Sequence, residues 1–230
     1  MTAKILISID AGFVTTGLTA YLVNTKRGIK LISAQIIETK KHKNKAAIRV
    51  SDDDVERLKF WTNGMNDFIS DVKKIIKRTY IKRGYEADDI KFKLFASIEF
   101  PSGGAKGARA LRCMSMITGA LVPFLVLKDI PFEAVTPTQV KSIVKNKKSV
   151  TKEDVIKSVI IYLRDNKICT VILTKKSERK KYISLHSSIT DYTDSITLSL
   201  FEHVADSVSA MKYVVENSQL YKLFVGVKNG

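Results

Sequence analysis

The sequence predicts an α/β protein built on a five-stranded mixed sheet, in which three antiparallel strands precede parallel strands and helices flank the sheet. Two observations predict this class. The chain opens on a nearly continuous apolar run at 4–10, and two more strand-like segments follow it. Longer segments with helical apolar spacing then alternate with short apolar runs. A chain of 230 residues that is 45% hydrophobic can bury one substantial core.

The first half of the chain is expected to form a meander and a long helix. The three antiparallel strands are expected at 4–10, about 17–24 and 29–38. Between 55 and 78 apolar residues recur at helical spacing, with Trp61 as a core anchor. The aspartate run at 52–54 is interpreted as a cap for this helix in a solvated loop rather than as a metal site.

The second half continues the alternation of strands and helices. FKLFASIEF is the expected fourth strand and IPFEAVTP the fifth. The segment 107–127 is apolar on most sides, which predicts a buried helix, partly covered by another subunit. The remaining expected elements are helices near 137–145 and 151–164, a hairpin with a cationic tip within 166–185, a helix from about 188 that closes the core, and a further helix in the tail from 206. We interpret 1–230 as one domain with insertions near 40–53, 80–90 and 166–185.

Charge indicates the kind of partner. Lys+Arg 39 against Asp+Glu 23 give a net charge of +16, which attracts polyanions in a salt-dependent way. A generally solubilising lysine surface is the alternative. The two cysteines are isolated, and the first acid at position 10 leaves no room for a signal peptide. The longest apolar stretch, MITGALVPFLVL, is too short to span a bilayer. We therefore expect an intracellular protein with no membrane partner.

Two acids end strand-like runs. Asp10 closes KILISID and Glu99 closes KLFASIE. Open sheets bind ligands at the carboxyl ends of their strands, so the two acids share one edge if their strands are parallel neighbours. Either acid taken alone is more often a turn residue or a helix cap.

Two further acids lie three residues apart in the amphipathic segment DYTDSITLSLFEHVA. Asp191 and Asp194 continue the stripe of Leu198, Phe201 and Ala205, which is expected to face the core. Carboxylates placed together repel unless a metal ion or a lysine joins them. A capping box beginning at Ser188 would explain Asp191 but would leave Asp194 without a role.

A site lined only by oxygen ligands selects Mg²⁺ or Mn²⁺ over zinc. Two such ions about 4 Å apart stabilise the attacking and the leaving oxygen in phosphodiester hydrolysis. This chemistry needs no histidine ligand, and His42 and His203 belong to no recognisable motif. The expected cofactor is therefore a pair of Mg²⁺ ions, for which Mn²⁺ substitutes.

Taken in order, these segments resemble the RuvC family of Holliday-junction resolvases, within the RNase H-like fold. ILISIDAGFVTTGL resembles the family's first strand with its metal-binding Asp, FASIEF carries the second acid, and DYTDSITLS resembles the closing double-Asp helix. The segments ERLKFWTNGMNDFI, ARALRCMSMITGALV, FEAVTPTQVKSIV and TKEDVIKSV resemble the elements between them. The insertions are longer than in compact bacterial members, which fits a phage, viral or organellar relative.

The resemblance implies roles for particular residues. The residues implied to bind divalent metal and activate water are Asp10, Glu99, Asp191 and Asp194. Lys141 and Lys152 would lie near the scissile phosphate, with Lys152 catalytic, and neutralise developing charge. Family members act as homodimers that nick two opposed strands of a four-way junction, and the helix at 107–127 would supply the two-fold interface.

DNA contacts are expected from basic loops at 40–45, 145–148 and 175–181. The candidate DNA-binding residues are Lys141, Lys145, Lys147, Lys148, Phe100, Lys106 and Arg109. In bacterial members an aromatic residue three positions beyond the second acid wedges into the junction. Ser102 stands there in this chain, and Phe100 is the only aromatic nearby, so stacking is expected to be absent or moved.

The sequence therefore predicts a magnesium-dependent endonuclease of branched DNA, a Holliday-junction resolvase that produces 5′-phosphate and 3′-hydroxyl ends. Two alternatives stay open. One is a less selective nuclease for flaps, forks or RNA–DNA hybrids, and the other is a non-catalytic DNA-binding relative. A phosphotransferase of the actin-like fold would need a second phosphate-binding glycine turn, which the sequence does not place after a later strand.

Overall fold

The computed structural model describes residues 1–24, 28–40, 49–100, 107–144, 149–165, 169–175, 181–187 and 193–226. The strands between 169 and 197 are described mainly by their backbone. Their described side chains are those of Ile183, Ser184, Leu185, Ser187, Ile196 and Thr197.

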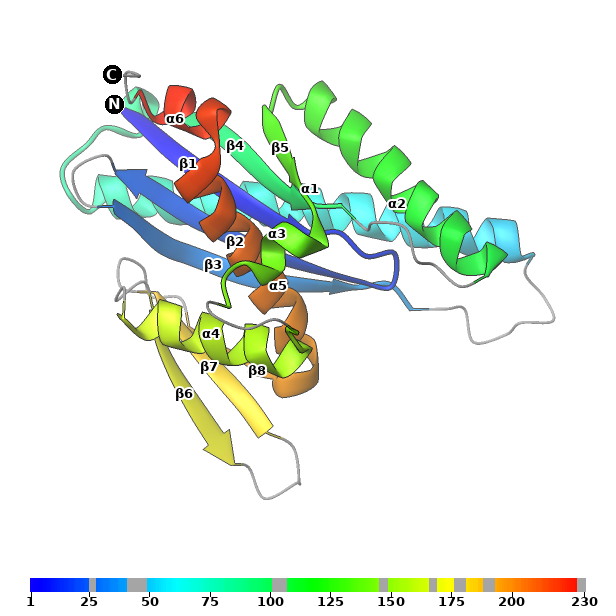
Figure 1. Ribbon diagram of the computed structural model, residues 1–230. Helices are drawn as coiled ribbons and strands as arrows, with labels where there is room; N and C mark the ends of the chain where they lie inside the picture. The colour runs from blue at the N-terminus through cyan, green and yellow to red at the C-terminus, as the bar shows by residue number, and fades with distance from the viewer. Residues whose placement is uncertain are drawn as a thin grey trace.

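The centre of the molecule is a five-stranded mixed sheet with strand order β3-β2-β1-β4-β5 (Figure 1). Its strands are β1 (Thr2–Asp10), β2 (Thr15–Asn24), β3 (Gly28–Glu38), β4 (Lys91–Glu99) and β5 (Phe132–Val135). The first three pair antiparallel, and β4 and β5 then run parallel to β1. The predicted meander, the two later strands and the mixed sheet are confirmed.

Helices cover both faces of this sheet. The long helices α1 (Val50–Ile81) and α2 (Ala108–Leu127) pack on one face, where Trp61 is 1% exposed and serves as the predicted core anchor. The other face carries α3 (Pro137–Lys141), α4 (Lys152–Asp165), α5 (Leu198–Asn217) and α6 (Gln219–Val225). A single 3-10 turn, η1 (Ala87–Asp89), precedes β4. Helix α5 runs across β1, β2 and β4, so it brings the end of the chain onto the middle of the sheet.

A second, three-stranded sheet lies beyond α4 and α5. Its strands are β6 (Cys169–Lys175), β7 (Lys181–Ser187) and β8 (Thr193–Thr197), and β6 and β7 form the predicted hairpin. The predicted helix from about 188 is wrong over 193–197, where the chain pairs antiparallel with β7, and positions 188–192 lie outside the described residues. Three of these five residues are β-branched, which favours a strand once a partner strand is available. Helix α5 begins only at Leu198 and continues through the tail to Asn217.

The aspartate run at 52–54 has a different role from the predicted cap. Because α1 already begins at Val50, Asp52 and Asp53 lie in its first turn, and the side chain of Asp54 is fully buried. Its carboxylate accepts hydrogen bonds from both terminal nitrogens of Arg109 and lies 3.1 Å from Nη2 of Arg112. These three residues, called here the Asp54 clamp, join α1 to α2. The interpretation as a cap in a solvated loop was therefore wrong for Asp54.

Helix α2 packs on the sheet through one face only. Ile117, Leu121 and Leu125 are buried in the core, whereas Leu111 and Val126 are 58% and 63% exposed. A Cβ atom added at Gly119 would meet nothing within 4 Å, so the outward face is open there as well. Within the described residues, α2 is also the one helix that by length and apolar composition could cross a membrane. A core helix of a soluble protein meets the same criterion, so this is weak evidence for a membrane segment.

Candidate active site

The site begins with the two acids at the carboxyl ends of β1 and β4. Asp10 and Glu99 are register partners in these neighbouring parallel strands, so their backbones lie side by side. Because side chains alternate along a strand, each acid shares the face of the serine two residues before it. Those serines, Ser8 and Ser97, bond to each other at 2.6 Å on the α5 side of the sheet. Both acids are therefore directed toward α5.

Helix α5 is fixed over the acids by a buried polar seam. Ser8 Oγ donates to the carbonyl of Ser207 at 2.5 Å, and Thr19 Oγ1 lies 3.1 Å from Ser207 Oγ. The helix also approaches β2 closely, because a Cβ atom added at Gly17 would lie 2.2 Å from the carbonyl oxygen of His203. Only glycine fits this crossing. These contacts hold the turn of α5 that carries the functional side chains.

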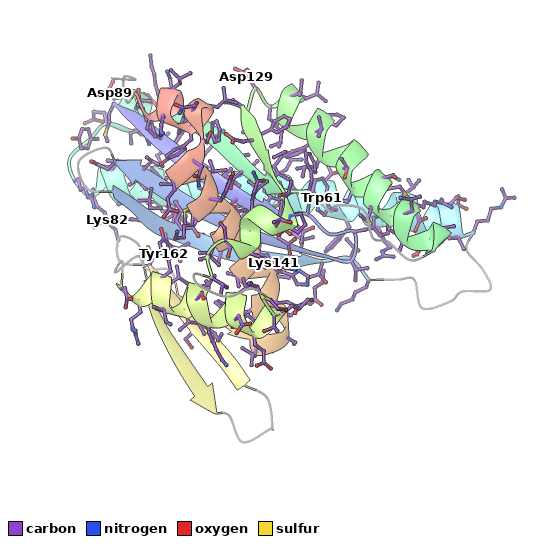
Figure 2. All side chains as sticks on the ribbon, viewed as in Figure 1. Trp61, Lys82, Asp89, Asp129, Lys141 and Tyr162 are labelled. Atoms are coloured by element: carbon purple, nitrogen blue, oxygen red, sulfur yellow. The ribbon has the colours of Figure 1, made fainter. Side chains whose placement is uncertain are left out.

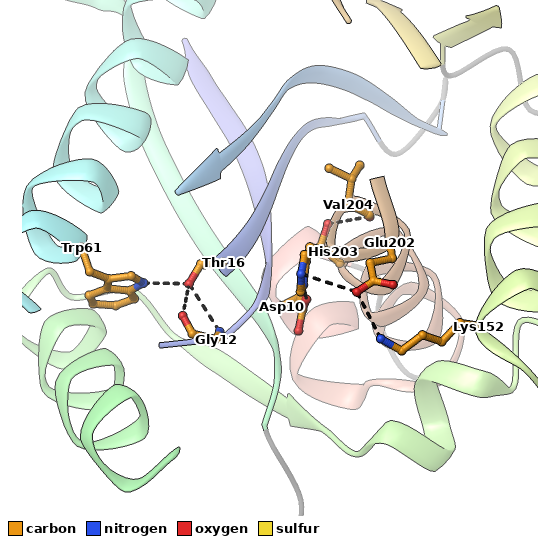
Figure 3. A network of polar contacts seen from close by, with 9 residues as sticks. Asp10, Gly12, Thr16, Trp61, Lys152, Glu202, His203 and Val204 are labelled. Carbon is orange, nitrogen blue, oxygen red and sulfur yellow. Dashed lines mark hydrogen bonds and ion pairs between the residues drawn. The ribbon is translucent and has the colours of Figure 1, made fainter. Parts of the chain in front are cut away.

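His203 and Asp10, almost two hundred positions apart, meet at this crossing. His203 Nδ1 lies 2.7 Å from Asp10 Oδ2, a hydrogen bond that Figure 3 shows at the end of β1. Burial lowers the pKa of His203, but the bond to Asp10 and the nearby carboxylates of Glu202 and Asp206 outweigh it, and the net shift is upward. The histidine is thus held by the acid it faces.

Two acids are held in surroundings that disfavour their charge. Burial, followed by repulsion from Asp10 and Asp206, raises the pKa of Glu99 to about 8, and Lys141 partly offsets this. Burial, followed by repulsion from Asp10, raises the pKa of Asp206 to about 7, against a smaller opposing effect of His203 and Lys152. Such paired carboxyl groups with strongly raised pKa values are typical of functional sites.

The acids open into a cavity of about 260 Å³ between α3, α4 and α5. Figure 2 shows Lys141 at the end of α3, on the side where α5 crosses the sheet. The charged residues that line the cavity are Glu99, Lys141, Lys152, Glu202 and Asp206. Glu99 and Asp206 therefore share this space with Lys141 and Lys152, and such a combination of acids and lysines can bind a cation beside a phosphate.

The residues fit a hard divalent cation. Oε2 of Glu99 is buried and accepts no hydrogen bond within the described part of the chain, so it has an unused acceptor aimed into the site. The carboxylate oxygens of Asp10, Glu99 and Asp206 are the kind of ligand that Mg²⁺ and Mn²⁺ prefer. Among the described residues, no group of three or more acidic, histidine or cysteine side chains lies together as a ready-made metal site.

The turn after Asp10 is supported from the opposite face of the sheet. Thr16 Oγ1 donates to the carbonyl of Gly12 at 2.7 Å and accepts a hydrogen bond from Trp61 Nε1 at 2.9 Å (Figure 3). The turn is tight, since a Cβ atom added at Gly12 would lie 2.1 Å from the carbonyl oxygen of Thr15. The core anchor of α1 therefore also supports the loop that follows Asp10.

Four of the predicted site residues come together. Asp10 and Glu99 lie side by side, and Lys141 and Lys152 line the same cavity as Glu99. Asp194 lies in β8, and its side chain is not described. The predicted residues Asp191, Lys106, Lys145, Lys147 and Lys148 lie outside the described residues.

The two remaining candidates do not lie in the cavity. Phe100 is half-buried and packs against the core on the α1 and α2 side. Arg109 belongs to the Asp54 clamp, with its side chain 42% exposed.

Sequence reasoning missed His203, Asp206 and Glu202. A signal for them was present, because they are the only ionisable residues between 198 and 209 in an otherwise apolar helix. Two of them stand three apart, on one helical face. The signal was masked by the earlier pair at 191 and 194, which has the same spacing.

The strand order, with acids at the carboxyl ends of β1 and β4, defines an RNase H-like α/β fold. The backbone is similar to that of Thermus thermophilus RuvC, with a TM-score of 0.48 and 16% identity over 92% of this chain and 95% of that chain. RuvC of T. thermophilus in complex with a Holliday junction substrate gives a TM-score of 0.46 and 13% identity, with the same coverage. The resolvase of Fowlpox virus in complex with Holliday junction DNA gives 0.41 and 11%, over 92% and 97%. No protein-family model and no curated protein matches the sequence.

Proposed function

We propose that this protein is a divalent-metal-dependent endonuclease that resolves four-way DNA junctions. The observation that carries the proposal is the convergence of Asp10, Glu99, Asp206 and His203 beside a cavity lined by Lys141 and Lys152. Acids alone could serve a structural role, and lysines alone could be a solvated surface. Together they supply ligands for a cation and positive charge for a phosphate, which phosphodiester hydrolysis needs at one place.

Each group in the site has a proposed task. Asp10, Glu99 and Asp206 would hold a pair of Mg²⁺ or Mn²⁺ ions, and His203 orients Asp10. Bound ions would supply Lewis-acid activation of water and stabilise charge on the phosphate. Lys141 and Lys152 neutralise charge that develops on the phosphate oxygens. Cleavage leaves 5′-phosphate and 3′-hydroxyl ends, as the sequence resemblance implies.

The net charge of +16 supports binding of the DNA backbone outside the cavity. Lysines in the loops at 40–45, 145–148 and 175–181 contact the arms of the junction in this proposal. Arg109 can contribute because its side chain is 42% exposed, although its guanidinium bonds to Asp54. Selectivity for four-way DNA is the part of the proposal that rests on the sequence resemblance.

Resolution requires two nicks, so we propose a homodimer with the outward face of α2 at the two-fold axis. Leu111, Gly119 and Val126 leave that face apolar and open. Val126→Glu is expected to convert the dimer to a monomer in light scattering, because it places a charge in a dry interface. The same change at Phe60, which is 57% exposed on α1, is the matched control and should leave the mass unchanged. A monomeric parent protein would contradict the dimer.

The test of the proposed function compares substrates and variants. A labelled four-way junction, a flap, a duplex and an RNA–DNA hybrid are incubated with Mg²⁺ or with EDTA, for the parent protein and Asp10→Asn. Paired nicks on the junction alone, lost with EDTA and in the variant while DNA binding is retained, support the resolvase. Equal cleavage of all four substrates indicates the less selective nuclease, and binding without any cleavage indicates a non-catalytic DNA-binding protein.

A further inference from the structure

Glu202 links two parts of the cavity wall. Its Oε1 atom lies 3.1 Å from Nζ of Lys152, on α4, and 3.7 Å from Nε2 of His203 (Figure 3). With the bond from His203 to Asp10, these contacts form a continuous chain from the end of β1 to the start of α4. Glu202 has no part in the proposed ligand set, so its place in this chain needs its own explanation.

The ion pair between Lys152 and Glu202 is exposed on the lysine side, so another anion can replace Glu202 there. The side chain of Lys152 is 76% exposed, against 27% for Glu202, so the acid is fixed and the lysine is accessible to solvent. Exposed pairs of this kind contribute at most about 1 kcal/mol, since water and salt compete with them. A phosphate offers the lysine the same kind of partner as a carboxylate, namely an anionic oxygen that accepts a charge-assisted hydrogen bond.

We propose that the Glu202 carboxylate pairs with Lys152 in the DNA-free protein, in the place that a DNA phosphate takes later. When the phosphate binds, Lys152 leaves Glu202 and pairs with the phosphate. This inference rests on the proposed nuclease function and assigns Glu202 as a positioning residue that acts through Lys152. The carboxylate keeps the lysine beside the cavity, where the scissile phosphate enters. Incoming DNA must replace one anionic partner of Lys152 by another.

The exchange predicts an effect on affinity and little effect on the chemical step. While DNA is bound, Lys152 contacts phosphate in either case, so the transition state is stabilised to the same extent. The cost of displacing Glu202 falls entirely on binding. Removing the acid should therefore lower Kd and KM and leave kcat nearly unchanged.

The test uses Glu202→Gln and a matched control, Glu153→Gln. Glu153 is the neighbour of Lys152 on α4, but it is 83% exposed and pairs with Lys157 at 4.0 Å. Binding of a labelled four-way junction is measured in EDTA over a range of salt concentrations. Glu202→Gln should bind up to about fivefold more tightly, the equivalent of one exposed ion pair. Its salt dependence should steepen by about one phosphate contact.

A double-mutant cycle separates the ion pair from a general charge effect. In a Lys152→Ala background, Glu202→Gln should change affinity no more than Glu153→Gln does, because the displaced partner is gone. With Mg²⁺, Glu202→Gln should lower KM by the factor seen in binding and hold kcat within about twofold.

Two results would overturn the inference. Equal affinities for the two glutamine variants in the parent background would show that Lys152 gains nothing from loss of Glu202. A collapse of kcat in Glu202→Gln to the level of Asp10→Asn would place Glu202 among the metal ligands instead. Failure of the parent protein to bind any DNA would remove the proposed function, and the inference with it.

Discussion

The molecule shields carboxylates from solvent at two places, fully at Asp54 and partly around Asp10, and their neighbours shift the pKa values in opposite directions. In the Asp54 clamp one acid meets two guanidinium groups, and the hydrogen bond from Arg109 is the main cause of a lowered pKa. Around Asp10 the acids outnumber their cationic neighbours, and the pKa values of Glu99 and Asp206 are raised. The first acid is neutralised by the protein itself. The second group lacks such compensation, and Oε2 of Glu99 has no partner in the described ranges.

The difference distinguishes acids that stabilise the fold from acids that serve the proposed reaction. A paired acid contributes to the fold, and its removal leaves the partner charges unsatisfied. A set of carboxyl groups with raised pKa values and fewer cationic neighbours is instead typical of a functional site. Substitution should therefore separate the two places, with activity sensitive at one and stability at the other.

The largest expected effect separates Asp10 from Asp54. Asp10→Asn should lower junction cleavage at least about a hundredfold, the scale for loss of one electrostatic group in a site, with folding retained. Asp54→Asn should keep cleavage within a few fold but lower the free energy of unfolding by about 2–3 kcal/mol, through lost charge-assisted hydrogen bonds. Cleavage assays and thermal melts measure the two effects. An inactive but fully stable Asp54→Asn protein would reverse the comparison.

A second comparison sets Asp206, which lines the cavity, against Asp194, the acid predicted from the sequence. Asp206→Asn should also lower cleavage at least about a hundredfold, because Asp206 is one of the three proposed metal ligands beside the cavity. Asp194→Asn should leave cleavage within a few fold, because Asp194 lies in β8 rather than on α5. Single-turnover cleavage at saturating protein measures both. Loss of activity in Asp194→Asn alone would restore the assignment predicted from sequence.

The support beneath Asp10 should have a smaller effect. Thr16→Val removes the hydroxyl that joins Trp61 Nε1 to the Gly12 carbonyl, and it leaves a buried donor without a partner. Such a loss costs about 1–3 kcal/mol of unfolding free energy. Thr16→Ser keeps the hydroxyl and is the control. Denaturant melts of both variants measure the difference, and equal stabilities would show that the hydroxyl is not needed.

In the metal-free protein, the acids around Asp10 and the acid Asp54 should contribute to the free energy of unfolding with opposite pH dependence. Glu99 and Asp206 have raised pKa values, about 8 and 7, so the native state binds more protons than the unfolded state between about pH 5 and pH 8. Their contribution is present at low pH and is lost as pH rises. The lowered pKa of Asp54 acts oppositely, since its contribution is lost only as pH falls below about 4.

In EDTA, Tm should therefore fall between pH 5 and pH 8 by at least about 2–4 °C, the equivalent of 1 kcal/mol for a protein of this length. Glu99→Gln should flatten the slope, and Mg²⁺ should raise Tm most at pH 8, where the acids are charged. Differential scanning fluorimetry at several pH values provides the measurement. A flat profile for the parent protein would contradict uncompensated acids at the site.

The central sheet could be predicted because each of its strands can be recognised from its own residues. The run at 4–10 is apolar throughout, which fits a strand covered on both faces, and Asp10 and Glu99 stand at strand ends. Their pairing needed only the assumption that β1 and β4 are parallel neighbours. The long helix around Trp61 followed from apolar spacing alone.

The closing helix could not be placed by spacing. In the sequence Asp194 stands at helical spacing from Leu198, which predicted a helix over 193–197. These residues instead pair with β7, a strand that only the tertiary structure brings beside them. Local periodicity cannot report such a partner, so the closing helix was predicted to begin too early, while the assignment of Asp191 and Asp194 to the site stays a prediction. The burial of Asp54 depends in the same way on arginines more than fifty residues further along the chain.

The crossing at Gly17 has a consequence for how this protein can change. The carbonyl of His203 rests where a methyl group would otherwise stand, so the close approach of α5 to β2 depends on the missing side chain at this position. A single added methyl would push α5 away from β2 and withdraw the imidazole of His203 from Asp10. Substitution of Gly17 during evolution would therefore give proteins that fold but lack the activity of the site.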